Sequence, residues 1–141
     1  MFFIRLKTHF DSAHFLKNYV GKCSNIHGHR WYVEIEIKSE KLIEEGSKKD
    51  MVYDFTNVKE AINKIVEEYD HCLIVEKGTL QKRTYESLLM EGFRIVETLS
   101  RPTAEHLSYV FFEKIKALGY PVYKVSVYET ETNCAVYQED D

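Results

Sequence analysis

The sequence has little cysteine, proline and glycine. Its 141 residues include only 3 cysteines, 2 prolines and 6 glycines. Three widely spaced cysteines do not make a disulfide framework, and so few prolines and glycines leave little room for a linker between domains. We therefore expect a single domain over residues 1–141, long enough to bury a hydrophobic core without covalent cross-links.

An excess of positive charge and a long apolar run are also missing. The 23 acidic residues outnumber the 19 basic ones, which gives a net charge of -4 at pH 7. That sign disfavours a protein that binds mainly the phosphate backbone of nucleic acids. No segment reaches the roughly 18 apolar residues of a membrane span, and Arg5 and Lys7 interrupt the apolar start that a signal peptide needs. We expect a cytoplasmic protein with no nucleic-acid and no membrane partner.

Alternation of apolar and polar residues predicts strands at both ends of the sequence. The clearest alternating run begins at Trp31, and the polar stretch 129–133 separates the last two strands as a hairpin loop. The expected strands are residues 3–10, 31–38, 122–128 and 134–138.

Helical spacing predicts helices between the two strand pairs. Apolar positions from Val58 to Tyr69 follow this spacing, and a second helix runs from an N-cap at Thr103 to a stop at Gly119. Residues 79–92 form a weaker helical pattern, followed by a short strand at 93–99. The order predicts an α+β fold, an antiparallel sheet of two hairpins with helices packed on one face. The backbone groups at the edges of this sheet need hydrogen-bond partners, and we expect pairing between subunits to supply them.

Three histidines are candidate metal ligands. His27 and His29 are two residues apart, so on an extended segment both imidazoles project from one face. The pair alone is weak evidence, but His14 ends the first strand, and hairpin pairing brings it to the same face. Three imidazoles with an open fourth position are typical of catalytic zinc, although imidazoles also suit iron, nickel and copper.

Four other residues are candidates for the chemistry of the site. Cys23 precedes His27 by four residues and has polar neighbours. It is a candidate for a fourth metal ligand or for a reactive thiol beside the metal, and the alternative is a small buried side chain. Asp70 and His71 form either a carboxylate–imidazole pair for proton transfer or an ordinary helix C-terminus. Glu129 is by default a solvated charge.

Six motifs resemble one known family in their order and spacing. They are FDSAHF, CSNIHGH, MVYDF, the Asp70–His71 pair, PTAEHL and VYETETNCAVY. Together they resemble the 6-pyruvoyl-tetrahydropterin synthase family, and most of all its bacterial 6-carboxy-tetrahydropterin synthases of queuosine (7-deazaguanine) biosynthesis. The resemblance extends from Phe3 to Tyr137. It implies the tunnelling fold, in which trimers close their strands into a barrel and two trimers stack as a homohexamer with active sites at subunit interfaces.

The resemblance also implies the metal and the thiol of the site. His14, His27 and His29 match the family's Zn²⁺ ligands. Cys23 matches the catalytic thiol that removes a proton from the substrate side chain. The implied substrate is 7,8-dihydroneopterin triphosphate. The sequence does not identify the residues that bind its triphosphate group.

Five further residues match family positions around the substrate. Asp70 and His71 match the catalytic partners of the thiol in proton transfer. Glu129 matches the carboxylate that anchors the pterin ring, and Thr103 with Glu105 match a second substrate-binding motif. The implied reaction yields 6-carboxy-5,6,7,8-tetrahydropterin, acetaldehyde and triphosphate, and it makes the protein a lyase.

Two other functions remain as alternatives. The 6-pyruvoyl synthases share the zinc ligands, but the three residues between Cys23 and His27 match the bacterial carboxy enzymes. A non-catalytic pterin- or metal-binding module is the other alternative. A cupin-like metal protein is disfavoured because the second cupin motif is missing from this sequence.

The segment 78–101 is longer than in compact family members, and the sequence does not indicate its role. Cys72 and Cys134 match no catalytic position, and we expect both to fill the core.

Overall fold

Two long antiparallel strands form the centre of the sheet. The computed structural model describes residues 1–140, in which β1 (Phe2–His14) pairs with β2 (His27–Ser39) along their whole length. Both strands are longer than alternation predicted, because polar and histidine residues replace apolar ones where the strands meet the connecting loop. The hairpin therefore carries all three candidate histidines within its strands.

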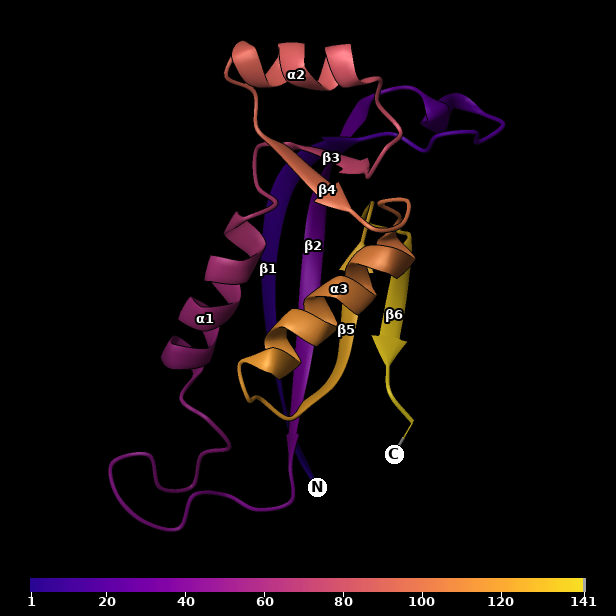
Figure 1. The fold of residues 1–141 in the computed structure, drawn as a ribbon. Helices are drawn as coiled ribbons and strands as arrows, with labels where there is room; N and C mark the ends of the chain where they lie inside the picture. The colour runs from indigo at the N-terminus through magenta and orange to yellow at the C-terminus, as the bar shows by residue number, and fades with distance from the viewer. Residues whose placement is uncertain (141) are drawn as a thin grey trace.

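The second predicted hairpin is confirmed next to the first. β5 (Val122–Tyr128) pairs antiparallel with β2, and β6 (Cys134–Gln138) pairs antiparallel with β5. The loop between them matches the polar stretch 129–133. The four strands of the two hairpins thus lie side by side in one sheet, as expected (Figure 1).

Two short strands extend the other edge of the sheet and make it mixed. β3 (Leu73–Glu76) runs parallel to β1, and β4 (Ile95–Thr98) runs parallel to β3. The strand order is β4-β3-β1-β2-β5-β6. β4 was predicted, whereas β3 was missed because four residues are too few to show a period. The sheet is therefore not wholly antiparallel.

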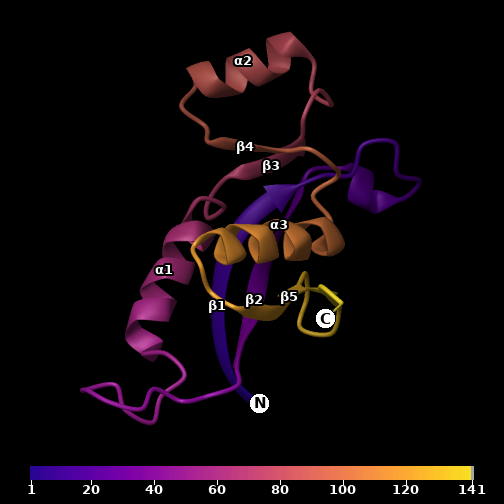
Figure 2. The ribbon, with the colours of Figure 1, turned by 60° about the horizontal axis from the view of Figure 1, so that its bottom comes forward.

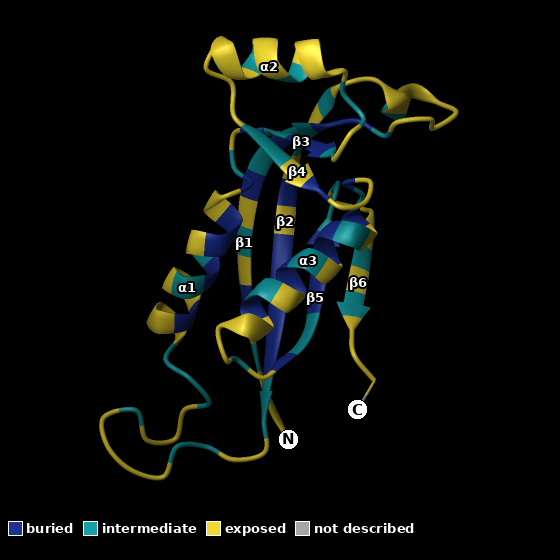
Figure 3. Cartoon of the chain, in the orientation of Figure 1, coloured by how far each residue is buried: buried dark blue, intermediate teal, exposed yellow. Residues whose placement is uncertain are grey.

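Two helices cover one face of the sheet, as predicted. α1 (Phe55–Glu67) and α3 (Ala104–Ala117) lie on the same side of the strands (Figure 2). Thr103 caps α3 as expected, since its hydroxyl accepts a hydrogen bond from the His106 N–H. The core between these helices and the sheet is continuous, and most of it is fully buried (Figure 3). Its largest fully buried side chains are those of Trp31, Phe10, Phe111 and Phe112.

The third helix lies apart from this layer. α2 (Lys82–Met90) stands beyond β4 at the end of the sheet and has no buried residue (Figure 1). The long segment 78–101 therefore contributes a peripheral helix and an edge strand. None of the helices in residues 1–140 is long and apolar enough to cross a membrane.

The opposite face of the central strands is charged. Glu34 and Glu36 project there and are almost fully buried beneath longer cationic side chains. Arg5 pairs with both carboxylates, Lys7 lies 3.1 Å from Glu34, and Lys124 lies 3.4 Å from Glu36. These ion pairs satisfy the two buried carboxylates on a face that the described helices do not cover.

Candidate metal centre

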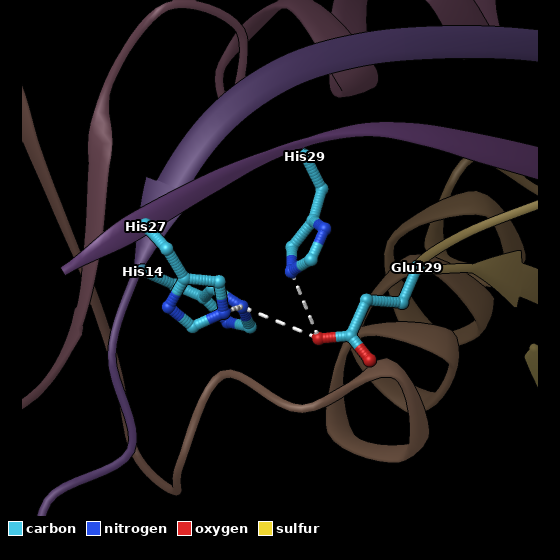
Figure 4. Close-up of side chains that lie close together, drawn as sticks. All are labelled: His14, His27, His29 and Glu129. Carbon is cyan, nitrogen blue, oxygen red and sulfur yellow. Dashed lines mark hydrogen bonds and ion pairs between the residues drawn. The ribbon is translucent and has the colours of Figure 1, made fainter. Parts of the chain in front are cut away.

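The loop end of the β1–β2 hairpin brings three imidazoles together. His14 stands opposite His27 in the strand register, and His29 follows on the same face (Figure 4). The His14 and His27 Nε2 atoms are 3.1 Å apart. One Glu129 oxygen, Oε1, lies 3.3 Å from His14 Nε2 and 3.2 Å from His29 Nε2. One ligand atom from each of these four residues lies within 4.8 Å of the others.

Backbone carbonyls fix the tautomers of two imidazoles. His14 Nδ1 donates to the Pro102 carbonyl, and His27 Nδ1 donates to the Asn25 carbonyl, each at 2.7 Å. In the tautomer that carries its proton on Nδ1, each ring directs an Nε2 lone pair toward the other. Such outer hydrogen bonds orient metal-binding histidines in general. A cation shared by the two Nε2 atoms would turn this lone-pair contact into an attractive one.

Burial favours the neutral form of His14 and His29, which is the form that binds a metal. His14 is 1% exposed, and loss of solvent lowers its pKa and that of His29 below the usual range. Among the described residues, the buried His29 Nε2 has no aligned hydrogen-bond partner. Neutral imidazoles and one carboxylate suit Zn²⁺ and, by ligand type, other first-row metals as well. The residues present thus fit the expected zinc.

Trp31 forms the inner wall of the cluster. It is fully buried, and its ring packs edge-on against His14 and His29 at centroid distances of 4.9 and 5.2 Å. Phe10 stacks against the far side of the indole. Sequence analysis placed Trp31 in a strand but not at the site. Its position two residues after His29 was the available signal, because such residues share a face.

Glu129 reaches the cluster from the loop after β5. Its backbone N–H donates to the Asn133 carbonyl, which closes the loop. The resemblance assigned this carboxylate to the pterin ring, and sequence analysis did not foresee its contact with the imidazoles. Only Oε1 makes that contact, and Oε2 points away from the cluster (Figure 4).

Cys23 occupies a short helical turn between the two strands. The turn, Lys22–Ser24, is closed by hydrogen bonds from the Ser24 N–H and hydroxyl to the Gly21 carbonyl. The Leu16 N–H donates to the Cys23 carbonyl and ties the turn to the end of β1. The thiol is half-buried and does not belong to the group of four candidate ligands. The structure therefore does not bring the Cys23 thiol to the imidazoles as a fourth ligand.

Asp70 and His71 form a pair after α1, as the sequence suggested. Asp70 Oδ2 lies 2.8 Å from His71 Nδ1, and Asp70 Oδ1 accepts a hydrogen bond from the Asp11 N–H. That N–H, together with the neighbouring imidazole, lowers the pKa of Asp70. The His71 N–H donates to the Asp11 carbonyl, and His71 has a left-handed backbone with φ of 52°.

Among the described residues, no hydrogen bond or ion pair joins the Asp70–His71 pair to the imidazole cluster. His71 lines a cavity of about 730 Å³ together with Asp11, Ala13, Gly28 and one member of the cluster, His29. Asp11 and Ala13 alternate with His14 along β1, so their side chains point to the other face of the hairpin. One chain therefore places His71 and His29 at one cavity without a described hydrogen bond or ion pair between the pair and the cluster.

The remaining residues singled out from the sequence are two at the start of α3 and two cysteines. The Thr103 hydroxyl is engaged in capping, and Glu105 is exposed in the first helical turn. Cys72 is buried as expected, and burial raises its pKa to about 11. The expectation for Cys134 was wrong: it is exposed, because its side of the β6 edge strand is not covered by a helix.

Comparison with known proteins identifies the family. A family model described as 6-pyruvoyl tetrahydropterin synthase matches residues 3–140. The chain belongs to the 6-pyruvoyl tetrahydropterin synthase family. Within this synthase family, the chain is 31% identical over 142 residues to the 6-carboxy-5,6,7,8-tetrahydropterin synthase of Haemophilus influenzae, covering 99% of this chain and 100% of the relative. It is 30% identical to the protein of the same name from Synechocystis, covering 97% and 93%.

Solved structures confirm the synthase fold. The 6-pyruvoyl tetrahydropterin synthase of Caenorhabditis elegans superposes with a TM-score of 0.69 at 22% identity, covering 99% of this chain and 96% of that one. An uncharacterized protein from Wolinella succinogenes gives a TM-score of 0.73 at 19% identity, covering 99% and 100%. The predicted α+β tunnelling fold of this synthase family is thereby confirmed.

Proposed function

We propose that this chain is a zinc-dependent 6-carboxy-5,6,7,8-tetrahydropterin synthase of queuosine biosynthesis that acts in the cytoplasm as one domain. It would convert 7,8-dihydroneopterin triphosphate and one water molecule to 6-carboxy-5,6,7,8-tetrahydropterin, acetaldehyde and triphosphate. The observation that carries the proposal is the cluster of three imidazoles in a chain whose relatives of that name match it almost from end to end.

The metal and pterin sites divide between the imidazoles and Glu129. His14, His27 and His29 would hold Zn²⁺, which when bound supplies Lewis acidity to the hydroxyl groups of the substrate side chain. Glu129 contacts the imidazoles through Oε1 alone. Its Oε2 is therefore available to accept hydrogen bonds from the amino and ring N–H groups of a pterin, a charge-assisted contact that orients the ring.

Cys23 and the Asp70–His71 pair would move the protons. Cys23 is partly accessible on a turn held by backbone hydrogen bonds, which suits a thiolate acting as a base. Asp70 is held in its charged form by the Asp11 N–H and binds His71 Nδ1, which leaves His71 Nε2 to exchange a proton with the substrate. Thr103 and Glu105 would add substrate contacts at the start of α3.

The separation of the two groups supports assembly of several copies. No described hydrogen bond or ion pair joins the Asp70–His71 pair to the imidazole cluster of the same chain, although His71 and His29 line one cavity. A second copy would place such a pair against a cluster from the other side of that cavity. The charged sheet face and the β6 edge are also uncovered by the described helices. We propose a homohexamer of two stacked trimers, in which sheet edges pair between subunits.

Mass spectrometry of the reaction products tests the proposal. Zinc-loaded protein is incubated with 7,8-dihydroneopterin triphosphate, with Cys23→Ala as the test variant and Cys134→Ala as the matched control. We expect 6-carboxy-5,6,7,8-tetrahydropterin and acetaldehyde from the wild type and from the control, and a loss of at least about a hundredfold in Cys23→Ala. Formation of 6-pyruvoyl-tetrahydropterin would move the chain to the other branch, and unchanged substrate would contradict both.

A further inference from the structure

Arg94 contacts the turn that carries the Asp70–His71 pair. Its Nη1 donates to the Asp70 carbonyl at 2.8 Å, and its Nη2 donates to the Glu68 carbonyl at 3.1 Å. Glu68 is the C-cap of α1, where backbone oxygens have no partner within the helix, and Asp70 lies in the turn that follows. One guanidinium thus joins the helix end to the turn and places a positive charge at the negative end of the helix.

The turn depends on such support because His71 is held mainly through its backbone. The His71 side chain is 76% exposed, so packing does not fix its orientation. Its left-handed backbone is unfavourable for a residue with a Cβ atom and persists only when neighbouring groups hold it. Asp11 holds one side of the turn through its N–H and carbonyl. Arg94 holds the other side.

The backbone of Arg94 is itself fixed in the sheet. Its carbonyl accepts a hydrogen bond from the Leu73 N–H, and β4 begins at the next residue. The guanidinium therefore projects from an anchored position onto the carbonyls that precede His71. This arrangement gives the long segment 78–101 a task that its exposed helix alone does not explain.

We propose that Arg94 is a positioning residue, which holds the Asp70–His71 turn in the conformation that aligns the pair for proton transfer. The effect on turnover rests on the proposed function, whereas the effect on the turn does not. Loss of the two hydrogen bonds would let the His71 backbone leave its left-handed conformation. The imidazole would then lose its alignment with Asp70 Oδ2, although both side chains would remain present.

The test compares Arg94→Ala and Arg94→Lys with Arg83→Ala. Arg83 belongs to the same segment, but its guanidinium donates to the neighbouring Gln81 side chain on the exposed α2. Hydrogen exchange of the Asp11 and His71 amides, measured by NMR without substrate, reports the turn directly. Steady-state assays with 7,8-dihydroneopterin triphosphate give kcat and KM separately, with and without added methylguanidine.

In Arg94→Ala we expect His71 amide exchange to rise by about tenfold or more while core amides of β2 stay protected. We expect kcat to fall by about tenfold to a hundredfold with little change in KM. Lysine, with one amine for two carbonyls, should give an intermediate loss, and methylguanidine should restore part of the activity of Arg94→Ala. Arg83→Ala should match the wild type in every measurement.

Two results would overturn the assignment. One is wild-type exchange at His71 and wild-type kcat in Arg94→Ala. The other is an equal rise in exchange over the whole core, with no rescue by lysine or methylguanidine, because that pattern belongs to a general loss of stability. If the wild type does not turn over the substrate, the proposed function fails, and the exchange measurements still decide whether Arg94 holds the turn.

Discussion

His14 and His27 stand opposite each other at the end of the β1–β2 hairpin, with their Nε2 atoms 3.1 Å apart. Each donates its Nδ1 proton to a carbonyl, and in that tautomer both Nε2 atoms present a lone pair to this contact. Two lone pairs at this distance repel each other, and a bound cation would remove that repulsion. The fold therefore holds the two rings in an arrangement that a metal ion makes favourable, and His29 adds a third imidazole on the same face.

Removal of the metal should lower stability, and His27→Ala should abolish that dependence. An ion that binds only the folded state stabilises it by about 2.7 kcal/mol when its free concentration is one hundred times the Kd. Thermal unfolding with zinc and with a chelator, combined with metal analysis, measures this effect. The exposed His9 provides the control: His9→Ala should keep one zinc per chain, and equal zinc content in His27→Ala would contradict the assignment.

Truncation of Trp31 should be strongly destabilising because the indole fills the space between the core and the imidazoles. Removing a buried tryptophan side chain costs about 3–5 kcal/mol. Denaturant unfolding should show a loss of that order in Trp31→Ala and a clearly smaller loss in Trp31→Phe, which keeps an aromatic ring. A loss below about 1 kcal/mol in Trp31→Ala would show that the cluster does not need this wall.

The pH dependence of stability should change when Asp70 loses its charge. The pKa of this carboxyl is lowered in the folded protein from its ordinary 3.8. Its contribution is therefore complete above that value and disappears as the pH falls through the lower folded pKa. Because Asp70 is partly exposed, we expect Asp70→Asn to lose under about 1 kcal/mol at pH 7 and nothing at the acidic end.

Unfolding free energies at several pH values measure this effect. Glu45→Gln, at an exposed position in the loop before α1, is the control and should follow the wild type. A loss in Asp70→Asn that is the same at every pH would show that the carboxylate charge is not what stabilises the turn.

Capping of α3 gives a prediction about Thr103 that is separate from any role in substrate binding. Loss of an N-cap hydroxyl costs about 1 kcal/mol, so Thr103→Ala should be destabilised by that amount in denaturant unfolding. Thr103→Ser keeps the hydroxyl and should retain most of the stability. Equal stability of all three proteins would mean that the hydrogen bond to the His106 N–H contributes nothing.

Alternation in the sequence was enough to predict the hairpins and the shared face of the histidines. The run from Trp31 to Lys38 fixes which residues of β2 face the core, and His27 and His29 continue the same parity. The His14–His27 pairing follows from the hairpin. These features depend on local periodicity, which a single sequence displays.

Other features depend on contacts between distant segments, and the sequence does not display them. The carbonyls of Pro102 and Asn25 orient the imidazoles through backbone atoms, which carry no residue signature. Glu129 approaches the cluster because β5 pairs with β2. β3 was too short to recognise, and the burial of Cys134 was wrongly predicted because free cysteines are usually buried, whereas this one lies on the exposed side of the edge strand β6.

X-ray absorption spectroscopy of the zinc-loaded protein tests the central claim most directly. The account holds that His14, His27 and His29 bind the ion and that Cys23 stays free to act as a base. We predict a shell of nitrogen and oxygen ligands at about 2.0–2.1 Å, with imidazole scattering and no sulfur. A sulfur ligand at about 2.3 Å that disappears in Cys23→Ala would contradict the account, because the thiol would then be a ligand.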